Sequence, residues 1–133
     1  MEHINKPSIS VIIVTVGRPL LITRAINSIL KQDYSICEII IGDVSKGSET
    51  EKIVRNIDNN IIKYIKIINE KDPAVTLNSL IAQAKGELIA FCDDDDEWIS
   101  PHKLSKQVDK LNELGNEYGI IYCWYEIWDD RKD

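Results

Sequence analysis

The sequence has no long uninterrupted apolar run and no basic leader. Its longest apolar stretches, such as VIIV at residues 11–14 and IIKYIKII at residues 61–68, fall far short of the ~20 residues that a transmembrane helix needs. The N-terminal residues MEHINKPS lack the basic region followed by an apolar region that marks a signal peptide. We therefore expect no transmembrane segment and a cytoplasmic location, which includes the inner face of a membrane.

Cysteines and glycine-rich phosphate motifs are also scarce. The three cysteines, Cys37, Cys92 and Cys123, are far apart and lie in apolar segments. This pattern predicts buried free thiols rather than a disulfide or a zinc site. Neither a dinucleotide-binding glycine fingerprint nor a P-loop occurs, which argues against both of those phosphate-binding sites.

Basic patches are missing, and the acidic excess lies in one part of the chain. The 133 residues are 44% hydrophobic and 29% charged, which predicts one globular domain over residues 1–133. Residues 1–92 carry 11 Lys and Arg against 10 Asp and Glu, whereas residues 93–133 carry 5 against 12. Nucleic acid is therefore excluded as an expected partner. An anionic ligand near the acidic region would need a metal ion to mediate its binding.

Short β-branched segments alternate with segments of helical periodicity. The predicted strands are residues 8–14, 37–41, 61–68, 87–92 and 119–128. The predicted helices are residues 18–32, 48–57, 73–85 and 100–115. This alternation is typical of a three-layer α/β/α, Rossmann-like domain with a mostly parallel sheet.

Several helix ends carry recognisable capping residues. Ser48 and Glu51 have the spacing of a capping box, and Asp72 followed by Pro73 is a typical helix start. Ser100 with Pro101 predicts another helix start. Gly86 is expected to end the third helix in the left-handed conformation.

The stretch AFCDDDDEWIS at residues 90–100 places five carboxylates directly after a predicted strand. Like charges ~5 Å apart cost about 3 kcal/mol per pair at an effective dielectric of 20. Either a solvated loop separates these carboxylates, or a divalent cation neutralises them. Ligands of open α/β sheets bind beyond the carboxyl ends of the strands. The acidic stretch lies at such an end, and this position favours the cation.

The segments SVIIVTVGRP, EIIIGDVSKGSET, TLNSLIAQAKGELIAFCDDDDEW and PHKLSKQVDKL resemble the N-terminal, nucleotide-sugar-binding half of family 2 glycosyltransferases of the type A fold. The resemblance covers about residues 8–125, and its most specific part is the Asp-x-Asp motif after a strand. It implies a nucleoside-diphosphate sugar donor, with UDP favoured, and Mn²⁺ or Mg²⁺ as cofactor. It also implies a saccharide or lipid-linked acceptor and a role in cell-surface polysaccharide synthesis.

The resemblance assigns roles to individual residues. It places Thr15, Val16 and Arg18 near the nucleotide, Asp43 at the base and Asn78 in the donor site. Asp93 or Asp94 would contact the ribose, and Asp95, with Asp93, would hold the metal ion that bridges the diphosphate. Residues 14–17 read Val-Thr-Val-Gly where the family has Pro-Thr-Tyr-Asn, and Val44, Ser45 and Leu77 depart from its pattern. These departures affect donor contacts rather than the fold.

The family needs a further C-terminal region on the acceptor side, and we expect this chain to lack it. The general base is therefore unknown and is expected outside this chain. One alternative is a non-catalytic donor-binding or interaction fragment of a glycosyltransferase. A receiver-type signalling module is a second alternative, but it would need a lone aspartate after the third strand and a lysine after the fifth.

Three aromatic or imidazole side chains have simpler interpretations than ligand binding. We expect His102 to lie at the surface rather than to bind metal. Trp98 could stack on a base or sugar, or pack beneath the acidic stretch. Trp124 and Trp128 would lie on one face of the last strand and are interpreted as core or interface anchors. If they are exposed, they would favour self-association, so a homodimer is among the expected partners.

Overall fold

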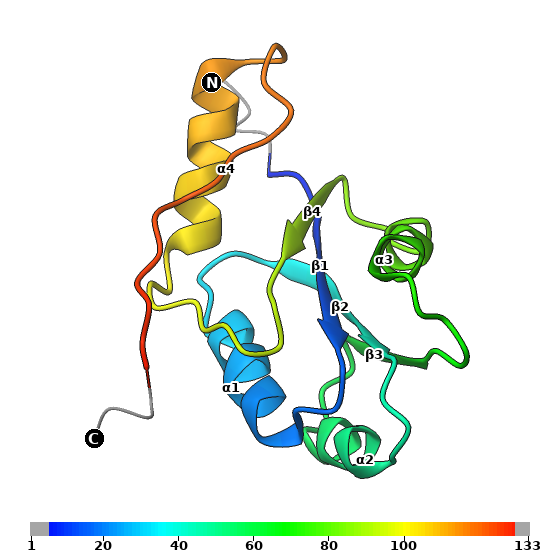
Figure 1. Ribbon diagram of the computed structural model, residues 1–133. Coiled ribbons are helices and arrows are strands. Elements are labelled where there is room, and N and C mark those ends of the chain that lie inside the picture. The colour runs from blue at the N-terminus through cyan, green and yellow to red at the C-terminus, as the bar shows by residue number, and fades with distance from the viewer. Residues whose placement is uncertain (1–5, 130–133) are drawn as a thin grey trace.

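The computed structural model describes residues 6–129 as a parallel sheet covered by helices on both faces (Figure 1). The strands are β1 (Ile9–Thr15), β2 (Ile36–Asp43), β3 (Ile62–Lys66) and β4 (Leu88–Phe91). The helices are α1 (Pro19–Leu30), α2 (Glu49–Asn56), α3 (Pro73–Ile81) and α4 (Lys103–Leu114). The four strands are parallel and follow the order β3-β2-β1-β4.

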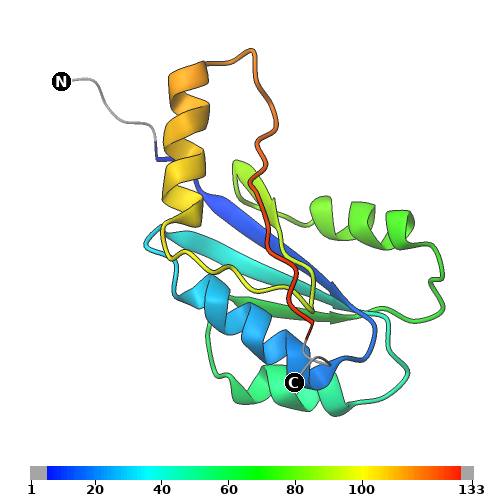
Figure 2. The same cartoon turned by 60° about the vertical axis from the view of Figure 1, so that its left-hand side comes forward.

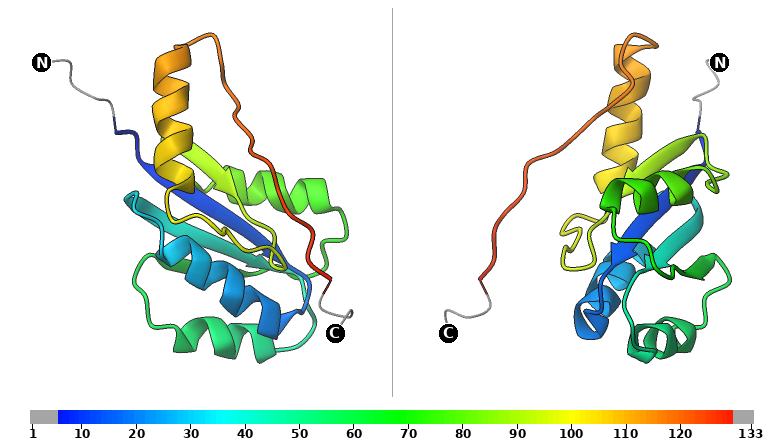
Figure 3. Two further views of the ribbon diagram at one scale, coloured as in Figure 1. Left: turned by 90° about the vertical axis from the view of Figure 1, so that its left-hand side faces the viewer. Right: turned by 45° about the vertical axis from the view of Figure 1, so that its right-hand side comes forward.

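The two faces of the sheet bury two separate apolar clusters, because successive side chains of a strand point to opposite faces. Ile9, Val11 and Ile13 of β1 pack with residues of α1, α2 and α4. Ile12, between them in sequence, packs with Leu80 of α3 on the other face. Figures 2 and 3 show α3 on the opposite side of the sheet from α1 and α2. This three-layer α/β/α arrangement confirms the predicted fold class.

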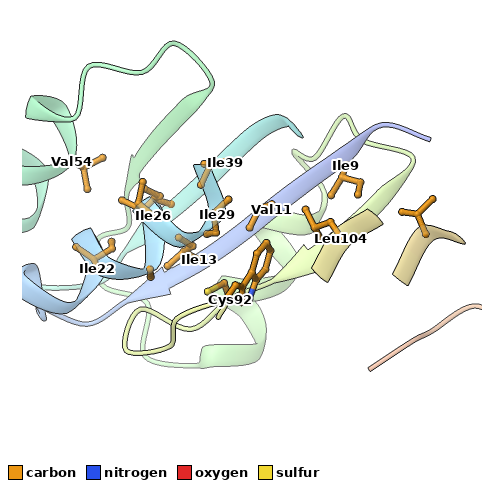
Figure 4. Close-up of a cluster of buried hydrophobic side chains, with 14 residues drawn as sticks. Ile9, Val11, Ile13, Ile22, Ile26, Ile29, Ile39, Val54, Cys92 and Leu104 are labelled. Carbon is orange, nitrogen blue, oxygen red and sulfur yellow. The ribbon is translucent and has the colours of Figure 1, made fainter. Parts of the chain in front are cut away.

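The larger cluster lies between β1 and α1 (Figure 4). Ile22, Ala25, Ile26 and Ile29 are buried on one side of α1, as their helical spacing predicts. Cys92 and Leu104 complete this cluster at the β4 and α4 side. The cluster therefore holds α1 and the start of α4 against the strand that leads to the acidic stretch.

The strand order separates this fold from the receiver-type alternative. Receiver domains have the flavodoxin-like order, in which the second strand is at the edge of the sheet and the first strand lies beside the third. Here β3 is at the edge, and β1 lies between β2 and β4. The order and the position of the acidic residues after β4 are therefore both incompatible with a receiver module.

The predicted fifth strand at residues 119–128 is wrong. This segment extends from α4 without regular secondary structure (Figure 3). Its large apolar side chains Ile120, Tyr122, Trp124, Tyr125, Ile127 and Trp128 are exposed. Its β-branched and aromatic composition suits a strand, but a strand also needs a hydrogen-bonding partner. Among residues 6–129 it pairs with no strand, so composition alone was misleading.

The helix ends confirm some capping predictions and correct others. Asp72 accepts a hydrogen bond from Ala74 N at 2.8 Å and caps α3 as expected. Ser48 makes no side-chain capping bond, so the predicted capping box is not formed. α3 ends at Ile81, before Gly86. Gly86 instead lies against β1, where an added Cβ would be 2.4 Å from Ser10 N, so the glycine permits close approach of the two backbones.

Two further sequence expectations need correction. α4 begins at Lys103 rather than at Pro101, which lies in the preceding turn. All three cysteines are free, but only Cys92 is buried, whereas Cys37 and Cys123 are exposed. Exposure of Cys123 follows from the absence of the fifth strand. No helix within the described part of the chain has the length and apolarity that crossing a membrane requires.

Candidate functional site

The carboxyl ends of the four strands bring polar residues into one row. In the parallel register Thr15 lies beside Asp43, and Asp43 lies beside Lys66. On the other side of β1, Ile12 pairs with Phe91, and three residues further along each chain Thr15 meets Asp94. We call Asp94, Thr15, Asp43 and Lys66 the carboxyl-edge row. The acidic residues 93–97, which we call the acidic loop, are thereby joined to the end of β1.

Asp94 is the buried residue of the acidic loop, with 1% of its surface exposed. Its Oδ2 accepts a hydrogen bond from Thr15 Oγ1 at 2.8 Å. Its Oδ1 is 3.0 Å from Arg18 Nη2, an ion pair, but the geometry is not that of a hydrogen bond, and this oxygen has no donor among the described residues. A buried carboxylate oxygen without a donor is costly. It therefore marks a position where another donor or a cation would be favourable.

Arg18 and Gly17 shape the end of β1. The Arg18 guanidinium also donates from Nη1 to Asp95 Oδ2 and so joins two carboxylates of the acidic loop. Gly17 has a φ of 93°, a conformation that side chains disfavour. An added Cβ at Gly17 would be 3.2 Å from the Ser45 Cβ. The glycine thus keeps the loop after β1 close to the loop after β2, while Val16 is exposed beside it.

The remaining aspartates of the acidic loop are exposed and strongly negative together. Asp93, Asp95 and Asp96 are all exposed. Burial raises the pKa of Asp96, and the charges of Asp93, Asp95 and Asp94 raise it further. Beneath them, burial and the charges of Asp96 and Asp93 raise the pKa of the Cys92 thiol to about 12. The loop therefore has an excess of negative charge that its own contacts do not neutralise.

Asp43 is fully buried at the end of β2 and already has several donors. Ser45 N donates to Oδ1 at 2.8 Å, while Tyr64 OH at 2.5 Å and Lys66 Nζ at 3.1 Å donate to Oδ2. Burial would raise the pKa of Asp43, but the hydrogen bonds from Ser45, Tyr64 and Lys66 outweigh it, so that the pKa lies below its ordinary value. Lys66 Nζ also donates to Gly47 O at 2.7 Å.

Tyr64 and Lys66 are functional candidates that the sequence analysis missed. Both come from β3, and the sequence assigned no role to any residue of this strand. The signal was present in the sequence, because a strand predicted over residues 61–68 in a parallel sheet must end at the same edge as its neighbours. Lys66 donates both to Asp43 and to Gly47 O. The Asp43 carboxylate therefore helps to hold the loop after β2 in place at the carboxyl end of the sheet.

The other predicted residues lie outside this cluster. Asn78 is exposed on α3, and no hydrogen bond among the described residues joins its side chain to the carboxyl-edge row. Trp98 is buried in the larger apolar cluster with Lys103 Nζ 4.4 Å from its ring centroid, so it packs beneath the acidic loop rather than facing a ligand. His102 is exposed, and its Nδ1 is 2.6 Å from Asp33 Oδ2, which agrees with a surface position.

The acidic loop suits a divalent cation that is coordinated partly by carboxylates of the loop and partly by water and phosphate oxygens of a bound substrate. Among residues 6–129 no group of three or more His, Cys, Asp or Glu side chains is arranged to hold a metal ion. Mg²⁺ does not need such a group, because it is commonly bound by one or two carboxylates together with water and substrate phosphates, and carboxylates suit Mn²⁺ equally. Asp93 and Asp95 supply two exposed carboxylates. The donor-free oxygen of Asp94 lies in the same loop.

Comparisons with known proteins point to one family. The model described as "Glycosyl transferase family 2" matches residues 10–132. The GalNAc(5)-diNAcBac-PP-undecaprenol β-1,3-glucosyltransferase of Campylobacter jejuni is 40% identical over 110 residues, which cover 80% of this chain and 35% of the relative. The chain thus spans about a third of the length of that relative.

Solved structures share the fold. A mannosyltransferase of Pyrobaculum calidifontis in complex with GDP-Man and Mn²⁺ has a TM-score of 0.71 at 23% identity, over 78% of this chain and 32% of the other. S. aureus TarS in complex with UDP-GlcNAc has a TM-score of 0.69 at 26% identity, over 80% of this chain and 31% of the other. Both matches cover about four fifths of this chain.

Proposed function

We propose that this chain, which belongs to glycosyl transferase family 2, forms the donor-binding part of a metal-dependent glycosyltransferase. The donor is a nucleoside-diphosphate sugar, with UDP as the favoured nucleotide, and the sugar is transferred to the hydroxyl of a saccharide or a lipid-linked acceptor. The observation that carries this proposal is the acidic loop anchored through Asp94 to Thr15 at the carboxyl edge of the sheet.

The cation, Mn²⁺ or Mg²⁺, would be held by Asp95 and Asp93. When bound, it supplies positive charge that offsets the negative charge of a diphosphate leaving group. Thr15 holds the Asp94 carboxylate in place. This bond fixes the backbone that carries Asp93 and Asp95. Because these neighbours are exposed, they can reach a ligand without first being uncovered.

The nucleotide would lie along the carboxyl-edge row. Val16 offers an exposed apolar surface beside the end of β1, and Arg18 carries donors suited to phosphate oxygens. Asp43, predicted to accept from the base, is already bonded to Tyr64 and Lys66. Its contribution is therefore first to orient the loop after β2, and a contact with the base would use an oxygen lone pair that these donors leave open. Asn78 on α3 stays a predicted donor-site residue.

A donor-binding domain without transferase activity is the second candidate. The chain spans about a third of the length of the relatives named above. We assign no described residue as the general base that would take the proton of the acceptor hydroxyl. The expectation that this base lies outside the 133 residues stays a prediction.

Calorimetry on the full 133-residue chain tests donor binding. UDP and GDP are titrated with and without Mn²⁺, and heat is expected only with the metal present, with the larger effect for UDP. Asp95→Asn should weaken metal-dependent nucleotide binding by about tenfold or more. Asp109→Asn removes one exposed acid from α4 and should leave nucleotide binding nearly unchanged. If neither nucleotide releases heat or raises the melting temperature, the donor-binding proposal is rejected.

Transfer itself is tested separately with a radiolabelled UDP-sugar and lipid-linked or saccharide acceptors. Product formation by the 133-residue chain would favour the enzyme over the donor-binding domain. Donor binding without product would favour the second candidate.

A further inference from the structure

Arg18 lies between a buried and an exposed carboxylate of the acidic loop. Its Nη2 is 3.0 Å from Asp94 Oδ1, and its Nη1 donates to Asp95 Oδ2. Asp94 is 1% exposed, whereas the side chains of Arg18 and Asp95 are 43% and 44% exposed. The Arg18 guanidinium thus contacts the buried Asp94 carboxylate and also the exposed Asp95 carboxylate, which is predicted to hold the metal ion.

Within the part of the chain that the structure describes, the acidic loop contacts few other positive groups. Residues 93–97 contribute five carboxylates. Arg18 contacts two of them, and Arg24 contacts Glu97 at 3.7 Å and the carbonyl oxygen of Asp95 at 3.4 Å. Among residues 6–129, two guanidinium charges against five carboxylates leave an excess of three negative charges. Arg18 is therefore the cation that neutralises the Asp94 and Asp95 side chains when no metal ion is bound.

We propose that Arg18 is the resident counter-cation of the acidic loop and competes with the divalent cation for Asp95. This inference rests on the proposed donor-binding function and adds a step to it. Arg18 contacts Asp95 through Oδ2. A cation that binds this carboxylate weakens or displaces the Arg18 hydrogen bond, because two positive groups on one carboxylate repel each other. Arg18 then has free donors at the same edge of the sheet.

The displaced donors give a reason for metal and nucleotide to bind together. A diphosphate accepts hydrogen bonds from a guanidinium and also neutralises its charge. Metal alone leaves the displaced guanidinium without its Asp95 acceptor, whereas metal with nucleotide replaces the Arg18–Asp95 pair by a guanidinium–phosphate pair. The competition therefore predicts positive coupling between the two ligands, which by linkage is the same in both directions.

The test measures Mn²⁺ binding by the full 133-residue chain, with and without UDP. Electron paramagnetic resonance of the unbound Mn²⁺ gives the affinity. Arg18→Met should bind Mn²⁺ alone about tenfold more tightly than the wild type, because a neighbouring positive charge and a competitor are both removed. Its Mn²⁺ affinity should then rise less on addition of UDP than that of the wild type. Arg18→Lys keeps the charge but cannot bridge two carboxylates as a guanidinium does, so an intermediate affinity is expected.

Arg24→Met is the matched control. It removes the same charge from α1 near the same loop, but Arg24 contacts Glu97 and a backbone carbonyl rather than the Asp95 carboxylate. We expect less than about a threefold change in Mn²⁺ affinity. Equal effects of Arg18→Met and Arg24→Met would show that only net charge matters, and would overturn the competition. Absence of Mn²⁺ binding by every variant, with or without UDP, would overturn it as well.

The two proposals can fail separately. Tighter Mn²⁺ binding by Arg18→Met together with no binding of UDP or GDP would retain the competition and reject the donor-binding function. Metal-dependent UDP binding by the wild type, with Mn²⁺ affinity unchanged in Arg18→Met, would retain the function and reject the competition.

Discussion

Thr15 Oγ1 donates a 2.8 Å hydrogen bond to Asp94 Oδ2, although the two residues are 79 positions apart in the chain. The bond joins the end of β1 to the acidic loop that follows β4. Because both side chains are buried, it is shielded from competing water. It fixes one aspartate of the acidic loop inside the protein and leaves the neighbouring carboxylates at the surface, where the proposed metal ion and diphosphate would reach them.

Thr15→Val tests this anchor. Valine has nearly the shape of threonine but no hydroxyl, so the buried Asp94 carboxylate loses its donor. We expect a loss of about 1–3 kcal/mol in the free energy of unfolding, measured by urea denaturation. Metal-dependent nucleotide binding should weaken as the acidic loop becomes less ordered. Thr50→Val is the control, since Thr50 is equally buried but lies on α2. Equal losses in the two variants would contradict a specific role for the bond.

Tyr64→Phe tests the hydrogen bonds of Asp43. The variant removes the 2.5 Å bond to Asp43 Oδ2 and should cost about 1.5–3 kcal/mol at pH 7, as expected for a bond to a charged group. The pKa of Asp43 is lower in the folded protein than its ordinary value of 3.8. The ionised carboxylate therefore stabilises the fold above pH 3.8, and this stabilisation is lost as the pH falls through the folded-state pKa. The difference between variant and wild type should therefore narrow toward pH 3.

Urea denaturation at pH 7 and pH 3 measures this difference. Tyr34→Phe provides the control, because the Tyr34 hydroxyl donates to the carbonyl oxygen of Pro7 at 2.7 Å rather than to a carboxylate. Its effect should change little over the same pH range. A Tyr64→Phe effect that is as large at pH 3 as at pH 7 would contradict the role of the Asp43 charge.

Asp96→Asn should stabilise the protein without metal. Burial and the neighbouring aspartates raise the folded-state pKa of Asp96. The ionised Asp96 side chain therefore destabilises the fold above that pKa. This destabilisation disappears as the pH falls toward the ordinary pKa of 3.8. We expect a rise of about 1–3 °C in the melting temperature at pH 7 and almost none at pH 3.5. Scanning calorimetry at both pH values, with Asp109→Asn as control, measures it. A lower melting temperature at pH 7 would show that Asp96 makes a stabilising contact.

Exposed aromatic residues after α4 predict self-association. Trp124 is 99% exposed, and Trp128 is also exposed, and clustered exposed apolar side chains favour association. We expect the sedimentation coefficient to rise with protein concentration, and the double variant Trp124→Ser with Trp128→Ser to reduce this rise. Leu20→Ser, which replaces an exposed apolar side chain on α1, is the control. A wild-type chain that sediments as a monomer at all concentrations would contradict the expectation.

The periodic segments of the chain were predictable because their side chains follow the geometry of one element. The spacing of Ile22, Ala25, Ile26 and Ile29 predicted the buried side of α1, and the apolar run before Asp93 predicted β4. Residues 119–128 were predicted wrongly for a related reason. Local composition describes what a segment can form, whereas a strand forms only where another strand offers its backbone groups.

The sequence by itself determined the alternation of strands and helices and placed an acidic loop after the fourth strand, since hydrophobic periodicity and residue order are properties of the linear chain. Only the tertiary structure decided which acid is buried, that Thr15 and Arg18 hold it, and that Tyr64 and Lys66 bind Asp43. The physical reason is the parallel register of the sheet. It brings together strand ends that are far apart in sequence, and the contacts between them depend on distances that no local pattern records.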